Sequence, residues 1–194
     1  MRLALQLKNR VLPGAEGYED NYCFLTGGKM HVPSLLATEF EFIKIIYWLI
    51  VAKKHRSILE IGTNEGDATY WFLKAAEEID GKVVTIDKVD LYKGAESSRL
   101  TRSFIGSDDF FKDSREKKFD FIYVDGDHSF LGAFRDMLSA EYCVSSGGTI
   151  AIHDVNYDHG DDNMVRSAFE KYMTITRGKW IKLPCGEGLA IGEF

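Results

Sequence analysis

Cysteine is scarce in this chain, and its spacing excludes two common roles. The 194 residues contain only three cysteines, Cys23, Cys143 and Cys185, which lie far apart. Because their number is odd and no Cys-x-x-Cys pair occurs, the sequence predicts neither a disulfide framework nor a structural zinc site. Reduced cysteines suit a reducing compartment, so we expect a cytoplasmic protein.

Long apolar runs and an excess of positive charge are also missing. The longest apolar run, Ile45 to Ala52, is too short to cross a bilayer, and residues 1–12 lack an apolar core of signal-peptide length. The net charge is −6, from 30 acidic and 24 basic residues. We therefore expect no binding to nucleic acid and none to a membrane.

The length and the hydrophobic content of 45% predict one domain with a sizeable core. Glycines and prolines break up residues 1–34, which we interpret as an N-terminal arm or lid. A single domain is predicted over residues 35–194. It starts with a helix over Leu35–Lys54, for which Ser34 is the expected cap.

Short apolar strands then recur at regular intervals, and helical patterns separate most of them. The first five predicted strands are Ser57–Ile61, Lys82–Ile86, Ser103–Ile105, Phe119–Val124 and Thr149–Ile152. The predicted helices between and after them include Leu91–Thr101, Ser129–Tyr142 (with Leu131, Phe134, Leu138 and Tyr142 on one side) and Asn163–Tyr172. Two last strands, Lys179–Leu183 and Gly188–Gly192, form an antiparallel pair. This alternation predicts an α/β fold, with a mostly parallel sheet and helices on both faces.

The turn after the first strand carries the most informative glycines. It reads Glu60-x-Gly62-x-x-x-Gly66, which is neither the G-x-G-x-x-G of dinucleotide sites nor a phosphate loop ending in Gly-Lys-Ser/Thr. Glu60 would repel a pyrophosphate, so the turn favours a cationic or neutral ligand with hydroxyls. S-adenosylmethionine, with a sulfonium, an amino group and a ribose diol, fits this description. An ordinary turn between a strand and a helix is the alternative.

Acidic or polar residues follow the end of each predicted parallel strand. They are Glu60, Asp87, Ser107 with Asp108, Asp125 and Asp154. In an open parallel sheet these positions meet at one crevice where ligands bind. Asp87 suits a ribose diol, of NAD as well as of S-adenosylmethionine, and Ser107 and Asp108 suit an adenine edge. Taken singly, each acid could also be a turn former or a helix cap.

Two neighbouring strand ends carry residues suited to catalysis. One reads Asp125-Gly-Asp-His128 and the other His153-Asp154. Carboxylates of Asp125 and Asp154 can hold Mg²⁺, whereas His153 as a third ligand suits Mn, Fe or Zn better. His128 precedes a helix N-terminus, which should keep it neutral near pH 7 and able to act as a general base. The alternatives are a capping role for His128 and carboxylates that bind only the cofactor or backbone.

In their order along the chain, these motifs resemble class I S-adenosylmethionine-dependent methyltransferases. The similarity covers about residues 57–172 and is greatest to the macrocin O-methyltransferase-like and cephalosporin-hydroxylase-like group, of the methyltransferase 24 type. The group is related to metal-dependent catechol and caffeoyl-CoA O-methyltransferases. The resemblance implies a Rossmann-like, doubly wound sheet of seven strands whose last two form an antiparallel hairpin.

The resemblance also implies roles for individual residues. The methionine part of the cofactor would be held by Glu60 and the glycine turn, including Gly62, Thr63, Asn64, Gly66 and Thr69. Asp87 would bind the ribose, Ser107 and Asp108 the adenine, and Asp125 would contact the cofactor as well. Asp125, His153 and Asp154 would form the metal site, and His128 with Asp125 the catalytic pair. His153 departs from the usual Glu, and Val155 from the Asn that follows the second Asp in catechol-type enzymes.

The sequence therefore predicts an O-methyltransferase that acts on a hydroxyl of a small molecule, such as a sugar, a polyol or a catechol-like compound. Mg²⁺ or Mn²⁺ assistance and a homodimer are compatible with this prediction. Two other functions are left open. One is an NAD-dependent oxidoreductase, against which the glycine spacing argues. The other is a non-catalytic member that binds S-adenosylmethionine without turnover.

Overall fold

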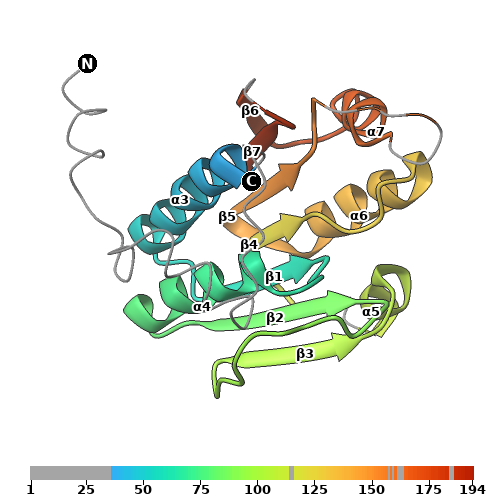
Figure 1. Cartoon of the computed structure of the whole chain (residues 1–194). Coiled ribbons are helices and arrows are strands. Elements are labelled where there is room, and N and C mark those ends of the chain that lie inside the picture. Colours follow the sequence, from blue (N-terminus) through green and yellow to red (C-terminus); the bar gives the residue numbers. More distant parts are fainter. Residues whose placement is uncertain (1–35, 114–115, 157, 159, 161–163, 184–185) are drawn as a thin grey trace.

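The computed structural model describes residues 36–113, 116–156, 158, 160, 164–183 and 186–194. The predicted arm over residues 1–34, including the cap Ser34, lies outside this part of the chain. Elements are labelled as in Figure 1. Among the described helices, none is both long and apolar enough to cross a membrane.

A seven-stranded sheet in the order β3-β2-β1-β4-β5-β7-β6 forms the centre of the molecule. The strands are β1 (Ser57–Ile61), β2 (Lys82–Asp87), β3 (Leu100–Phe104), β4 (Phe119–Val124), β5 (Val144–His153), β6 (Lys179–Leu183) and β7 (Leu189–Glu193). The first five pair in parallel, whereas β7 is antiparallel to β5 and to β6. This topology confirms the predicted Rossmann-like sheet with a C-terminal antiparallel hairpin.

Helices cover both faces of the sheet, as predicted (Figure 1). One face packs against α3 (Leu36–Lys53) and α4 (Asp67–Ile79), and the other against α5 (Ser107–Asp113), α6 (Phe130–Cys143) and α7 (Val165–Tyr172). Alternation along the strands produces the two cores, because successive side chains of a strand point to opposite faces. In β4, Phe121 and Tyr123 join the α3–α4 side, and Ile122 and Val124 join the other side.

The predicted helix over Leu91–Thr101 is wrong. Residues 88–99 form an irregular β2–β3 connection, and β3 begins at Leu100. This stretch lacks a buried apolar stripe of helical spacing, and it is held instead by contacts with the glycine turn, such as the bond from Lys93 N to Glu65 O. The short helix α5, which follows β3, was not predicted.

The orientation of α6 also differs from the apolar pattern of its sequence. Leu131 and Tyr142, on the predicted apolar side, are 59% and 60% exposed. The buried face is made by Ala133, Met137 and Ala140. One acidic residue, Asp136, lies on the same buried face and is 2% exposed.

Candidate functional site

The carboxyl ends of the parallel strands open into one cavity, as the strand-end residues predicted. Its volume of about 460 Å³ is in the range of small-molecule sites. Polar lining comes from Asn64, Asp87, Lys88, Ser107, Asp125, Asp127, His128, Asp136, His153, Asp154 and Glu187. Apolar lining is concentrated near β2 and β3, in Ile86, Val89, Leu91 and Ile105.

Gly62 allows the ends of β1 and β4 to touch. Its φ is +97°, and a Cβ atom there would lie 1.9 Å from the carbonyl oxygen of Asp125. The amide of Asp125 donates to the carbonyl of Ile61 over 2.9 Å, which locks the two strand ends together. A residue with a side chain at position 62 would push Asp125 away from the cavity.

Glu60 lies beneath the glycine turn and is fully buried. Its Oε2 accepts a hydrogen bond of 2.5 Å from the hydroxyl of Thr69, whereas Oε1 has no hydrogen-bond partner among the described residues. Burial raises the pKa of Glu60 to about 8, although hydroxyl donors partly oppose this shift. Glu60 and Thr63 line a smaller cavity of about 160 Å³ that shares Asn64 and Asp125 with the main one.

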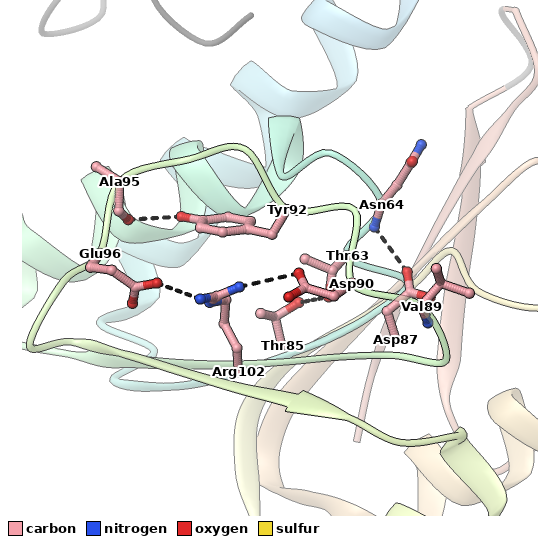
Figure 2. A network of polar contacts seen from close by, with 10 residues as sticks. All are labelled: Thr63, Asn64, Thr85, Asp87, Val89, Asp90, Tyr92, Ala95, Glu96 and Arg102. Carbon is pink, nitrogen blue, oxygen red and sulfur yellow. Dashed lines mark hydrogen bonds and ion pairs between the residues drawn. The ribbon is translucent and has the colours of Figure 1, made fainter. Parts of the chain in front are cut away.

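Asp87 joins the glycine turn to the connection that follows β2 (Figure 2). Its Oδ2 accepts from the amide of Asn64 over 2.9 Å, and its Oδ1 accepts from the amide of Val89 over 3.1 Å. A carboxylate can accept about four hydrogen bonds. Asp87 therefore keeps acceptor capacity for hydroxyls of a ligand while its orientation is fixed.

The β2–β3 connection is fastened to β3 by Arg102 (Figure 2). Its guanidinium pairs with Asp90 and with Glu96 and lies 4.6 Å from the ring centroid of Tyr92. The Tyr92 ring in turn occupies the space that a Cβ at Gly66 would need, 2.5 Å from the ring. The connection is thereby held where Val89 and Leu91 can line the cavity.

The predicted catalytic residues meet at the ends of β4 and β5. The Nε2 atom of His128 lies 3.4 Å from Asp125 Oδ1 and 3.5 Å from Asp154 Oδ2. The Nδ1 atom of His153 lies 2.8 Å from Asp154 Oδ1 and 3.7 Å from Asp125 Oδ1. Asp154 adopts a φ of +61°, which is rare for a residue with a side chain and often marks a functional site.

Opposite charges set the protonation of this group. Burial disfavours a charged His153, but the carboxylates of Asp125 and Asp154 outweigh it and raise its pKa to about 11. Burial likewise opposes ionisation of Asp125, yet the two histidines hold its pKa well below the usual range. The hydrogen bond with Asp125 raises the pKa of His128, against the opposing effect of burial. The prediction that a helix N-terminus keeps His128 neutral is therefore wrong in direction, because the nearby carboxylates dominate.

Two overlapping sets of side chains are close enough to share one cation. Ligand atoms of Asp125, His128 and Asp154 lie within 4.8 Å of one another, as do those of His153, Asp154 and Glu187. The carboxylates fit a hard divalent ion, and the buried Oδ1 of Asp154 has no hydrogen bond among the described residues, although it forms the ion pair with His153. The donor set fits a metal, with His128 and Glu187 added to the residues predicted.

Most of the predicted cofactor-binding residues border the two cavities. Gly66 and Thr69 act indirectly. Gly66 leaves room for the Tyr92 ring, and the Thr69 hydroxyl donates a hydrogen bond to Glu60. Asp108 lies elsewhere, in a groove between α5 and α6. Four polar lining residues were missed, namely Lys88, Asp127, Asp136 and Glu187. Lys88 and Asp127 lie next to predicted residues and could have been inferred, whereas Asp136 and Glu187 reach the cavity through tertiary packing.

A comparison with known protein families identifies the chain. The model of a family described as a methyltransferase domain matches residues 59–155, which is half of the chain. No curated protein matches the sequence. An O-methyltransferase from Bacillus cereus, solved in complex with S-adenosylhomocysteine (SAH), has a TM-score of 0.69 at 18% identity, covering 100% of this chain and 97% of that one.

Two further solved structures share the fold. The O-methyltransferase TomG from Streptomyces achromogenes, involved in tomaymycin synthesis and solved with S-adenosylmethionine, has a TM-score of 0.60 at 17% identity, covering 94% of this chain and 99% of that one. The N-methyltransferase NodS from Bradyrhizobium japonicum has a TM-score of 0.56 at 15% identity, covering 81% and 96%. From the family match and the fold together, the chain belongs to the methyltransferase domain family, among the class I S-adenosylmethionine-dependent methyltransferases.

Proposed function

We propose that this protein transfers the methyl group of S-adenosylmethionine to a hydroxyl of a small molecule. The fold alone does not select the acceptor atom, since N- and O-methyltransferases share it. The observation that carries the proposal is the contact of His128 with both Asp125 and Asp154 at the rim of the cavity. A hydroxyl is a weak nucleophile until its proton is removed, and this group of residues can remove it.

Each part of the cavity has a role in this proposal. Asp87 accepts from the ribose hydroxyls, and Glu60 faces the amino group of the methionine part. When bound, S-adenosylmethionine supplies an electrophilic methyl group on its sulfonium. Asp125 and Asp154 orient the acceptor beside that methyl group, and His128 takes the hydroxyl proton while in its neutral form.

A divalent cation fits the same residues. Asp125 and Asp154, with His128, His153 or Glu187, would hold Mg²⁺ or Mn²⁺, and the ion would supply a positive charge that lowers the pKa of the acceptor hydroxyl. In the absence of an ion, the pKa of about 11 makes His153 the cation that balances these carboxylates. In either state, a positive charge lies beside the two carboxylates at the position proposed for the acceptor.

The acidic lining supports a neutral, hydroxyl-rich acceptor such as a sugar or polyol, with a catechol-like compound as the alternative. The acidic, polar sequence of residues 156–163 suits a segment that covers the acceptor together with the 1–34 arm, and both lie wholly or largely outside the described residues. A homodimer stays a prediction. We also propose a cytoplasmic location, which the free thiol of Cys143 supports.

Calorimetric titration with SAH tests the cofactor part of this proposal. We expect micromolar binding, and then turnover of hydroxylated acceptors with and without Mg²⁺ or Mn²⁺. If EDTA abolishes turnover but not SAH binding, the metal-assisted form is supported; if it changes neither, His128 acts without an ion. Binding of SAH without turnover of any sugar, polyol or catechol would support a non-catalytic member of the family.

A further inference from the structure

Asp136 of α6 is an acidic residue that the proposed mechanism leaves without a role. Its side chain is 2% exposed, yet it lines the main cavity. Hydrogen bonds reach one of its oxygens from the Ser107 side chain and the Asp127 amide. The other oxygen, Oδ2, has no hydrogen-bond partner among the described residues. Burial raises the pKa of Asp136 to about 6, so the carboxylate is mostly ionised at neutral pH.

Gly126 lies beside Oδ2 of Asp136. A Cβ atom at this position would lie 3.2 Å from Oδ2, in tight contact with it. Because glycine has no side chain, position 126 leaves space beside this oxygen, and both residues line the cavity. A buried acceptor with unused capacity normally has a donor, and a ligand in the cavity that Asp136 lines would supply one.

The surroundings of Asp136 fit a flat, apolar ring. The cavity that Asp136 and Ser107 line also has apolar lining from Ile86, Val89, Leu91 and Ile105, and Ile105 lies two residues before Ser107. Asp108, which the sequence suggested for the adenine edge, is 56% exposed and pairs with Arg135 in the separate groove between α5 and α6. Of the two acids near Ser107, Asp136 is therefore the one that lines the cavity.

We propose that Asp136 determines specificity for the nucleobase of the methyl donor, by accepting a hydrogen bond from the exocyclic amine of adenine while Ser107 holds the carboxylate in place. This inference rests on the proposed use of S-adenosylmethionine. A carboxylate has no hydrogen to donate, so it rejects a base that carries a carbonyl at the same position. Hypoxanthine is such a base and differs from adenine at that group.

The test compares two ligands on matched variants by calorimetry. SAH and S-inosylhomocysteine, in which hypoxanthine replaces adenine, are titrated into the wild-type protein and into Asp136→Asn. We expect the wild type to prefer SAH by about tenfold to a hundredfold, the usual effect of an unmatched charged hydrogen bond. In Asp136→Asn the preference should vanish or reverse, because the amide can donate to the hypoxanthine carbonyl.

Two further variants make this result specific. Asp109→Asn makes the same change on α5, at a side chain that is 65% exposed and pairs with Lys112, and it should keep the wild-type preference. Asp108→Asn tests the competing acid. If the preference changes in Asp108→Asn and not in Asp136→Asn, or if Asp136→Asn weakens both ligands equally, the proposal is overturned.

The inference can fail separately from the proposed function. Equal affinity of the wild type for SAH and S-inosylhomocysteine would overturn the role of Asp136 alone, whereas binding of neither ligand would overturn both. If Asp136→Asn does not fold, the wild type is titrated with an SAH analogue whose purine lacks the exocyclic amine. An undiminished affinity for that analogue overturns the proposal.

Discussion

The two ends of the parallel strands differ in how well their buried polar groups are paired. At the carboxyl ends, Glu60 Oε1 and Asp136 Oδ2 are buried without a hydrogen bond in the described part of the chain, whereas the buried Asp154 Oδ1 has only its ion pair with His153. At the amino ends, Asp120 accepts from the amides of Arg56 and Ser57 over 2.9 and 3.0 Å.

Other polar side chains at the amino ends are also paired. His55 is 5% exposed, and its Nε2 lies 3.0 Å from the hydroxyl of Thr149. Lys53 pairs with Glu193 over 2.7 Å. An unmatched buried acceptor costs about 1–3 kcal/mol. Among the described residues, the acceptors that bear this cost belong to side chains that line the two cavities. The contrast teaches that one end of the sheet contributes to stability and the other to binding.

His128→Asn should give the largest effect, and it should act on turnover alone. Loss of a positioned general base lowers the rate about 10²- to 10⁴-fold. The affinity for SAH should stay within about threefold, because the SAH contacts proposed above do not include His128. Initial rates and calorimetry measure the two quantities. A parallel loss of SAH affinity would show that His128 supports the cavity rather than the reaction.

Asp87→Ala should lower SAH affinity about tenfold to a hundredfold, since it removes charged hydrogen bonds to the ribose. The change also frees the amides of Asn64 and Val89, so the loss includes some disorder of the cavity wall. Asp90→Ala is the matched control, because it alters the same connection through Arg102 only. Similar losses in both variants would mean that Asp87 matters for the loop and not for the ligand.

Asp120→Ala should lower stability and leave SAH affinity and turnover unchanged. It leaves two backbone amides without their acceptor and should reduce the free energy of unfolding by about 1–3 kcal/mol. SAH affinity and turnover should be unchanged below the shifted melting temperature. Urea titration measures the first quantity. A change in SAH affinity would contradict the assignment of stability to the amino ends and of binding to the carboxyl ends.

Glu60→Gln should have the smallest effect on affinity at neutral pH and the clearest effect on its pH dependence. With a pKa of about 8, against a usual 4.5, Glu60 is neutral in the free protein at pH 7. Binding of the ligand ammonium should therefore release about one proton. Calorimetry in buffers of different ionisation enthalpy counts that proton, and Glu60→Gln should release none.

The raised pKa of Glu60 also predicts how the stability of the free protein depends on pH. A raised carboxyl pKa means that the folded state holds a proton that the unfolded chain has lost, so stability falls as pH rises from about 4.5 towards 8. Glu60→Gln should flatten this slope, and saturating SAH should also flatten it. A melting temperature that is equally pH-dependent in the variant would contradict the assignment to Glu60.

The sequence predicted those features that depend on short-range pattern. β1, β4 and β6 have the predicted bounds, and the strand-end acids Glu60, Asp87 and Asp125 border the cavities because parallel strands align their ends. The sequence missed what depends on tertiary packing. In the sequence, Asp136 is one polar residue among others on a helix. It is buried because α6 turns its Ala133, Met137 and Ala140 face, rather than its Leu131 and Tyr142 face, towards the sheet.

Glu187 illustrates a second limit. It lies in the turn between β6 and β7, and it approaches His153 and Asp154 because β7 pairs beside β5, opposite His153 at Leu189. The register of a hairpin against a distant strand leaves no local trace in the sequence. The helix prediction for the β2–β3 connection failed for a related reason. The conformation of this connection is set by contacts with Arg102 and with the glycine turn rather than by its own apolar periodicity.

The ion pairs of Arg102 should influence how fast the product leaves the cavity. Its partners Asp90 and Glu96 are 55% and 74% exposed, so dissolved ions can compete for the guanidinium. Product departure often limits the turnover of enzymes with mobile segments beside the ligand. Moderate salt should thus speed the escape of spent cofactor well before it affects the fold, and the steady-state rate would then rise with ionic strength.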